Sequence, residues 1–274
     1  MSKLVGIFEG QSFEEYCAID AANKSGLDKF LKSPLHYWAE YLDPNREPRE
    51  DTPALKLGKA IHCAVLEPAR FIDNYKALPK DLDRRTKDGK ASYEAIISSG
   101  SIPLSSDDFD TCVAISESIK KSIAAREIFA KGKSELTAVW EDSKVRCKAR
   151  IDWFTDDHAV LIDLKSTEDA GPEAFARSLL EYGYHRQAAW YVDGLVAATN
   201  LSKEPLFVFA VYEKKPPYAS AFYYATPEML EQGRVENRRL LSKYIECRAA
   251  KSWPGYPEEL RAAEFPRWFK PLEA

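Results

Sequence analysis

Two short apolar segments separated by a polar turn place the strongest constraint on how this chain can fold. Residues 149–152 and 161–167 show the alternation typical of β-strands. Because side chains alternate across a strand, an even number of loop residues places Asp152 on the same sheet face as Asp163 and Lys165. Four apolar side chains are then expected on the opposite face, toward a core: Ile151, Val160, Ile162 and Leu164.

The two carboxylates on the shared face repel each other, and both stay ionised only if a cation lies between them. Oxygen ligands suit a hard divalent ion such as Mg²⁺, and we expect Mn²⁺ to substitute for it. The main-chain carbonyl of Leu164 is a further candidate ligand. The Lys165 ammonium can orient an attacking water and offset developing negative charge, so the pair of strands predicts a metal-dependent phosphodiester hydrolase.

Composition and charge restrict the class of protein. The 274-residue chain is 45% hydrophobic and 30% charged, as expected of a globular protein with a sizeable core. A net charge of −4 argues against a general basic surface, although a local basic groove can coexist with an acidic metal pocket. The five cysteines are scattered and include no C-x-x-C pair, which argues against a zinc site, an iron–sulfur cluster and a disulfide framework.

We expect a cytoplasmic protein with reduced thiols and no membrane partner. An acidic residue interrupts the first nine residues too early for a secretory signal, and no apolar run approaches the length of a membrane span. Neither an internal repeat nor an inter-domain linker is visible. Residues 1–274 are therefore expected to form a single α/β domain in which helices flank a central mixed β-sheet.

Hydrophobic periodicity and turn residues predict the order of the secondary-structure elements. Between the first helices and the strands, residues 80–106 are expected to form a mobile, partly basic loop. The expected helices cover 12–42, 54–67, 107–130, 171–180, 184–198 and 226–248. The expected strands cover 135–140, 145–154, 160–165, 205–212 and 219–224, the first three as an antiparallel meander.

Three further residues on predicted helices can serve the same chemistry. His62 can supply a metal nitrogen or donate to a phosphate. Gln187 and Tyr191 lie four residues apart on one helix face, where they can position Lys165 or a strand phosphate. Individually each residue is more typical of helix packing, and Asp152, Asp163 and Lys165 could be ordinary hairpin residues.

Taken together and in this order, the motifs resemble those of RecB-type nucleases of the PD-(D/E)XK superfamily. The wider segments are similar to the exonuclease domain of RecE (exodeoxyribonuclease VIII) and its phage relatives, from about residue 20 to the end. Ile162 departs from the superfamily pattern, which has proline there. The motifs are Gly58-x-x-x-His62, Ile151-Asp152, Asp163-x-Lys165 and Gln187-x-x-x-Tyr191; the wider segments are Ser33-Pro34 with a following Tyr-Trp, residues 57–68, residues 182–191 and Trp253-Pro254-Gly255-Tyr256.

The resemblance implies a Mg²⁺-dependent exonuclease that digests linear double-stranded DNA from the 5′ end and leaves a 3′ single-stranded tail. It implies a RecT-like single-strand annealing protein as partner, and a homo-oligomeric ring threaded by DNA. It assigns Asp152, Asp163 and His62 to the metal, Lys165 to catalysis, and Gln187 and Tyr191 to the last motif. Glu135 resembles an upstream acid that can reach a metal, although a sheet-edge or hairpin role is more typical of such a residue.

Several basic residues are candidate DNA contacts. His185 and Arg186 precede Gln187 directly, and the basic segment adds Arg84, Arg85 and Lys87. Two alternatives stay open at this point. The chain could be another PD-(D/E)XK nuclease with different polarity or structure specificity, or a non-catalytic module that binds DNA ends or a recombinase.

Overall fold

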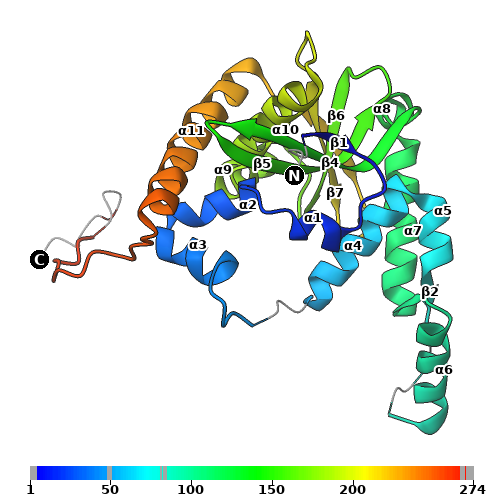
Figure 1. Cartoon of the computed structure of the whole chain (residues 1–274). Coiled ribbons are helices and arrows are strands. Elements are labelled where there is room, and N and C mark those ends of the chain that lie inside the picture. Colours follow the sequence, from blue (N-terminus) through cyan, green and yellow to red (C-terminus); the bar gives the residue numbers. More distant parts are fainter. Residues whose placement is uncertain (1–4, 48–50, 81, 83–84, 266–268, 270–274) are drawn as a thin grey trace, which may run out of the picture.

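A mixed β-sheet lies between two layers of helices in the computed structural model, which describes residues 5–47, 51–80, 82, 85–265 and 269 (Figure 1). Within these residues, the sheet has six strands in the order β1-β4-β5-β6-β7-β8. The strands are β1 (Gly6–Phe8), β4 (Gly132–Asp142), β5 (Val145–Thr155), β6 (Val160–Thr167), β7 (Leu206–Glu213) and β8 (Ser220–Tyr224).

The connections between strands explain why the sheet is mixed. Helices α9 (Pro172–Glu181) and α10 (Tyr184–Thr199) link β6 to β7, and this crossover makes the two strands parallel. The other neighbouring strands are antiparallel. The structure therefore confirms the predicted α/β domain and the antiparallel meander of β4, β5 and β6.

The other helices cover the two faces of the sheet and its ends. A short parallel pair, β2 (Tyr75–Ala77) and β3 (Ile102–Leu104), lies outside the main sheet. The helices are α1 (Phe13–Ala18), α2 (Lys24–Leu27), the 3₁₀ helix η1 (Asp28–Leu31), α3 (Pro34–Tyr41), α4 (Pro53–Leu66), α5 (Pro68–Asn74), α6 (Lys87–Ser98), α7 (Ser106–Lys121), α8 (Ile123–Ile128) and α11 (Pro227–Ala250). None of the helices in the described ranges is long and apolar enough to cross a membrane.

Each face of the sheet packs against its own hydrophobic core. The α10-side core joins sheet residues such as Ile151 and Phe207 to Trp190 of α10 and Leu241 of α11. The α4-side core joins Ile162, Leu164 and Tyr212 of the sheet to Ile61 of α4 and Ile115 of α7. Full burial of each large apolar side chain contributes about 1.5–3 kcal/mol. Both faces of the sheet are therefore covered by packed helices, and its central strands are held between the two cores.

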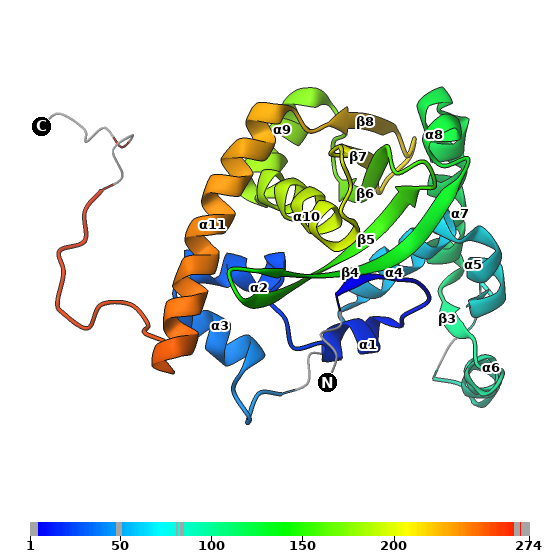
Figure 2. The same ribbon diagram turned by 45° about the horizontal axis from the view of Figure 1, so that its top comes forward.

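Three predicted segments differ from the structure. Residues 12–42 form several short helices because Ser12, Asn23 and Ser33 lie in extended conformations at new helix starts. The predicted helix at 107–130 is interrupted at Ser122, whose extended backbone starts α8. The loop expected at 80–106 contains α6 and β3, so the prediction of an irregular segment was wrong (Figure 2). Thr86 supplies the cap that starts α6.

A glycine between α9 and α10 offers a test of this packing. Gly183 has φ +62°, and a Cβ atom there would lie 1.9 Å from Nη2 of the buried Arg186. Because both strain and steric conflict result, we expect Gly183→Ala to lower the free energy of unfolding by about 2–4 kcal/mol. Urea denaturation measures this difference.

Gly100 provides the matched control, because its φ of +80° is similar and no described heavy atom lies within 4 Å of the position that a Cβ would take there. Gly100→Ala should cost only the backbone strain, about 1 kcal/mol. Equal losses for the two variants would contradict a packing role for Gly183 against Arg186.

Candidate active site

The site begins where β5 and β6 separate. In the described part of the chain, these strands are paired only through Trp153 with Ile162 and Phe154 with Leu161. Beyond these pairs, the amide of Leu164 donates to Oδ2 of Asp152 over 2.7 Å instead of to a strand carbonyl. The Asp152 side chain therefore occupies the gap between the strands and satisfies a backbone donor that the ladder leaves free.

The alternation of side chains in β5 is interrupted at Asp152. Ile151 and Phe154 both belong to the α10-side core, although an odd separation of three should place them on opposite faces. Ile162 and Leu164 belong to the α4-side core instead, so the prediction that Ile151 shares their face was wrong. The interruption turns Asp152 toward the gap.

A second irregularity brings Glu135 to the same place. The register of β4 with β5 omits Glu135, which lies between the pairs Ser134–Trp153 and Leu136–Ile151. Its φ of +52° lies in the left-handed region, which is unusual for a residue other than glycine. The pairs on either side keep the same register, so Glu135 and Asp152 interrupt the ladder one opposite the other, without the extra residue of a β-bulge. Glu135 therefore leaves the regular ladder directly opposite Asp152.

Helix α4 completes a trio of possible metal ligands. His62, Glu135 and Asp152 each offer one ligand atom, and these three atoms lie within 4.8 Å of one another. Nδ1 of His62 is 3.7 Å from Oδ2 of Asp152. Two carboxylates and one imidazole form a donor set that fits a divalent cation, so the side chains present are suited to the metal that the sequence predicts.

Burial and like charges make ionisation of the pocket carboxylates unfavourable, although the charge of Lys165 partly offsets the effect on Asp152. Burial raises the pKa of Asp152 well above its ordinary value, and the neighbouring charges of Asp163 and Glu135 raise it further. Burial lowers the pKa of His62, which favours the neutral imidazole that binds metals. A cation placed among these groups would relieve the repulsion.

Asp163 lies beside the trio and has partners of its own. Only 2% of the residue is exposed. Its Oδ1 accepts a hydrogen bond of 2.6 Å from the Gln187 amide, and its Oδ2 forms an ion pair with Lys165. Nζ of Lys165 also lies 4.7 Å from the centroid of the Tyr184 ring. The structure therefore brings Asp163, Lys165 and Gln187 together, adjacent to His62, Glu135 and Asp152.

Tyr191 lies one helical turn beyond Gln187 and packs against the α10-side core. Burial is the largest cause that raises the pKa of its hydroxyl, followed by the charge of Asp163; the Gln187 side chain opposes the shift. Tyr191 therefore remains neutral behind the acidic pair. Its surroundings indicate a supporting position at the back of the site.

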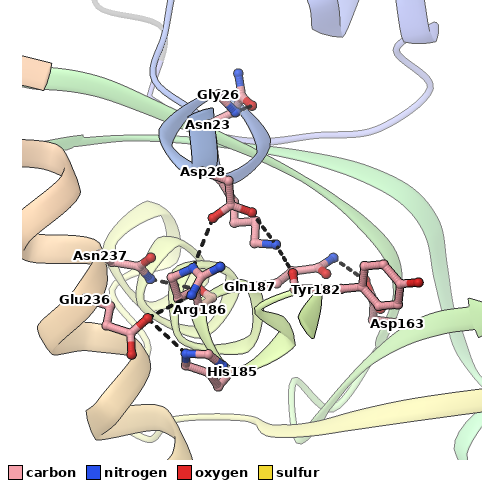
Figure 3. A network of polar contacts seen from close by, with 11 residues as sticks. Asn23, Gly26, Asp28, Asp163, Tyr182, His185, Arg186, Gln187, Glu236 and Asn237 are labelled. Atoms are coloured by element: carbon pink, nitrogen blue, oxygen red, sulfur yellow. Dashed lines mark hydrogen bonds and ion pairs between the residues drawn. The ribbon is translucent and has the colours of Figure 1, made fainter. Parts of the chain in front are cut away.

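The other predicted DNA contacts lie elsewhere. His185 and Arg186 are 6% and 7% exposed, and both bond to Glu236 of α11, which contradicts a contact with DNA (Figure 3). Lys87 and Arg85 are exposed at the start of α6, which projects away from the sheet (Figure 2). Arg84 lies outside the described residues.

Arg186 instead holds the helix that carries Gln187. Its guanidinium donates to Asp28 over 3.0 Å and to Glu236 over 2.8 Å. Its carbonyl accepts a hydrogen bond from Asn237. The first turn of α10 is thereby tied to η1 and to α11 (Figure 3). This network fixes the point from which Gln187 reaches Asp163.

Arg150 is a residue near the site that the sequence analysis missed. Its Nε donates to Oε2 of Glu135 over 2.6 Å, and its Nη1 donates to the carbonyls of Gln11 and Ser12. The available signal was its position two residues before Asp152, which places both side chains on one side of a regular strand. The sequence alone does not indicate which carboxylate pairs with Arg150; only the tertiary structure identifies Glu135.

Comparisons with known proteins agree with this architecture. The sequence profile described as "PDDEXK-like domain of unknown function (DUF3799)" matches residues 23–264. A crystal structure from Eubacterium rectale, of a protein provisionally described as an exonuclease, is similar with a TM-score of 0.64 and 13% identity. The alignment covers 94% of this chain and 96% of that one, and at this identity it concerns the fold. No curated protein matches the sequence.

The clustered carboxylates predict how divalent ions act on stability. Mg²⁺ or Ca²⁺ should raise the melting temperature of the wild type, because an ion that binds only the folded state stabilises it. Asp152→Asn should abolish most of this increase, and without metal it should be as stable as the wild type or about 1 kcal/mol more stable. Differential scanning calorimetry measures both effects.

The raised pKa of Asp152 predicts how the stability of the metal-free protein changes with pH. Because the pKa of Asp152 is raised on folding, the folded protein retains a proton that the unfolded chain releases. This contribution should make the metal-free wild type lose stability as the pH rises from about 4 through the raised pKa. The same loss in Asp152→Asn would contradict this origin.

Proposed function

Since the chain belongs to the DUF3799 family of PDDEXK-like domains, we propose that it is a metal-dependent nuclease that hydrolyses DNA phosphodiester bonds. One observation carries the proposal: a trio of candidate metal ligands lies beside the Asp163–Lys165 pair. A module that only binds DNA has no need of clustered carboxylates that repel phosphate. The arrangement therefore favours catalysis over the non-catalytic alternative.

The residues divide into those that hold a metal and those that act on the nucleophile. Glu135, Asp152 and His62 would hold the ion; Asp163 is a neighbouring carboxylate, and the Leu164 carbonyl on β6 is a further candidate ligand. We propose Mg²⁺ as the ion, with Mn²⁺ as a substitute. When bound, the ion polarises a phosphoryl oxygen and neutralises charge on the phosphate.

Lys165 is the proposed catalytic residue at the reacting phosphate. Its ammonium can orient the attacking water and offset the charge that develops on the phosphate oxygens. The Asp163 carboxylate and the Tyr184 ring hold the side chain in place. Gln187 fixes the orientation of Asp163, and Tyr191 closes the back of the site. Each role depends on contacts that exist before substrate arrives.

The finer proposal is an exonuclease that degrades linear double-stranded DNA in the 5′→3′ direction and leaves 3′ tails for strand annealing. The sequence resemblance supports it, and so does the exonuclease description of the similar E. rectale structure. A cytoplasmic location, a RecT-like annealing partner and a ring-shaped oligomer belong to this proposal. The second candidate is a nuclease of the same superfamily with another polarity or structure specificity, since one metal site can serve several substrates.

Substrate topology tests the exonuclease proposal. With Mg²⁺, the protein should degrade a linear duplex and leave a covalently closed duplex of the same sequence intact, because only the first has ends. Gel electrophoresis follows both substrates. Equal degradation of the two would contradict the exonuclease.

End labels separate the two polarities on the same linear substrate. Early release of a 5′ label, with a 3′ label retained on long products, is expected for 5′→3′ digestion. The reverse order would favour the second candidate.

Lys165→Ala tests the catalytic assignment. Loss of a group that acts on the nucleophile and on developing charge should lower the cleavage rate roughly 10²–10⁴-fold. Lys133→Ala is the matched control, because Lys133 also forms an ion pair, with Glu9 over 2.5 Å, but its side chain is 53% exposed whereas that of Lys165 is 13% exposed. Similar rates for the Lys165 and Lys133 variants would contradict the mechanism.

A further inference from the structure

Helix α1 is fastened to β5 alongside the proposed metal site. Nζ of Lys148 donates to the carbonyls of Tyr16, Cys17 and Ile19 at the end of α1. At its beginning, Arg150 donates to the carbonyls of Gln11 and Ser12. Two cations on one strand therefore hold both ends of a six-residue helix, which gives its side chains a defined position.

A continuous series of contacts, which starts and ends at the trio, places the start of α1 at the edge of the metal pocket. Arg150 contacts both Glu135 of the trio and the Ser12 carbonyl, directly before Phe13. The Phe13 ring centroid lies 5.1 Å from Nζ of Lys59. Lys59 precedes His62 by three residues on α4, so these two side chains lie about one helical turn apart on the same helix. The series of contacts therefore ends at His62 of the trio. Figure 2 shows α1 beside α4, in agreement with these contacts.

Phe13 is not part of the hydrophobic core. It is 48% exposed, and none of the described residues of α1 is buried. Its ring centroid lies 6.2 Å from that of Tyr16, yet about half of Phe13 remains exposed, so packing within the chain leaves much of the aromatic ring available; a leucine or alanine would favour the helix more. Phe13 also precedes residues 23–264, which the family profile matches, so it is a feature of this chain beyond the matched region.

The neighbouring surface of α4 is open. Gly58 lies one turn before His62, and no described heavy atom comes within 4 Å of the position that a Cβ would occupy. Glycine is less favourable than alanine inside a helix, and packing within the chain does not require it here. A missing side chain beside a metal pocket lets a ligand approach the helix closely.

Lys59 has a partner that a phosphate can replace. Its Nζ lies 2.5 Å from Oδ2 of Asp51, and both side chains are substantially exposed. Exposed ion pairs of this kind contribute little to stability, so exchange for a phosphate oxygen is energetically accessible. Glu14, on α1, is a second acidic group whose charge interacts with Lys59.

We propose that Phe13, Gly58 and Lys59 form a nucleotide platform at the entrance to the metal pocket. The proposal rests on the proposed nuclease function and specifies how the substrate end is bound. Phe13 stacks on an unpaired terminal base, Lys59 exchanges Asp51 for the phosphate of that nucleotide, and Gly58 leaves room for the sugar. The platform holds an unpaired end beside the trio and thereby favours ends over continuous duplex.

Fluorescence of 2-aminopurine tests the stacking contact. The base is placed at the unpaired 5′ terminus of a duplex or at its tenth position, and binding is measured with Ca²⁺ while gels verify intact DNA. The wild type should quench the terminal probe and not the internal one. Phe13→Ala should lose this quenching and bind the unpaired end about tenfold more weakly, whereas Phe13→Trp should retain both properties.

Two control variants define what would overturn the proposal. Phe265→Ala removes an aromatic ring that is 76% exposed on the C-terminal segment, and it should leave quenching unchanged. Lys59→Gln should weaken binding and reduce the salt dependence by about one phosphate contact, while Lys133→Ala should not. Wild-type quenching and affinity in Phe13→Ala, with an unchanged melting temperature, would overturn the platform.

The outcomes separate the platform from the nuclease. If the wild type cleaves DNA but Phe13→Ala quenches normally, the platform is wrong and the nuclease stands. If the wild type quenches through Phe13 but cleaves no DNA with Mg²⁺ or Mn²⁺, the platform stands and the nuclease is wrong. Absence of DNA binding by the wild type would overturn both.

Discussion

The hydrogen bond from the Leu164 amide to the Asp152 carboxylate is the interaction on which the rest of the site depends. Two central strands of a sheet cannot separate without leaving backbone groups unpaired, and a buried amide without a partner costs about 1–3 kcal/mol. Asp152 removes this cost because its side chain takes the place of a strand carbonyl. The strands can then diverge, and the carboxylate that permits the divergence also points into the gap with Glu135 and His62.

Charged groups around the gap are positioned by a second set of buried contacts. Arg186 ties the start of α10 to Asp28 and Glu236, and Gln187 reaches Asp163 from that fixed point. Arg186 is the buried partner, so removing its carboxylates would leave an uncompensated buried charge, which is destabilising. The cation that resembled a DNA contact in the sequence is therefore a support for the acidic site. On the opposite side, Arg150 performs a similar task for Glu135 and α1.

Local pattern predicted most of the fold and the strands that carry Asp152, Asp163 and Lys165. The alternation around Asp152 and Asp163 predicted β5 and β6, and the capped apolar periodicities predicted α4, α10 and α11. The predicted face of Ile151 was wrong because the alternation of β5 is interrupted at Asp152, opposite the unusual backbone of Glu135, and no local sequence pattern indicates this interruption. His185 and Arg186 were misassigned because a basic residue has the same appearance in sequence whether its partner is a phosphate or a distant carboxylate.

By itself, the sequence determined the elements, the mixed α/β class and the presence of two acids and a lysine on adjacent strands. These properties follow from side-chain alternation, helical periodicity and capping, which act between near neighbours. Only the tertiary structure decided which charges meet. Arg186 and Asp28 are separated by 158 positions, and Lys148 reaches Tyr16 across 132. Such pairs arise only when the packed sheet and helices bring remote segments together, because no local rule relates residues at those distances.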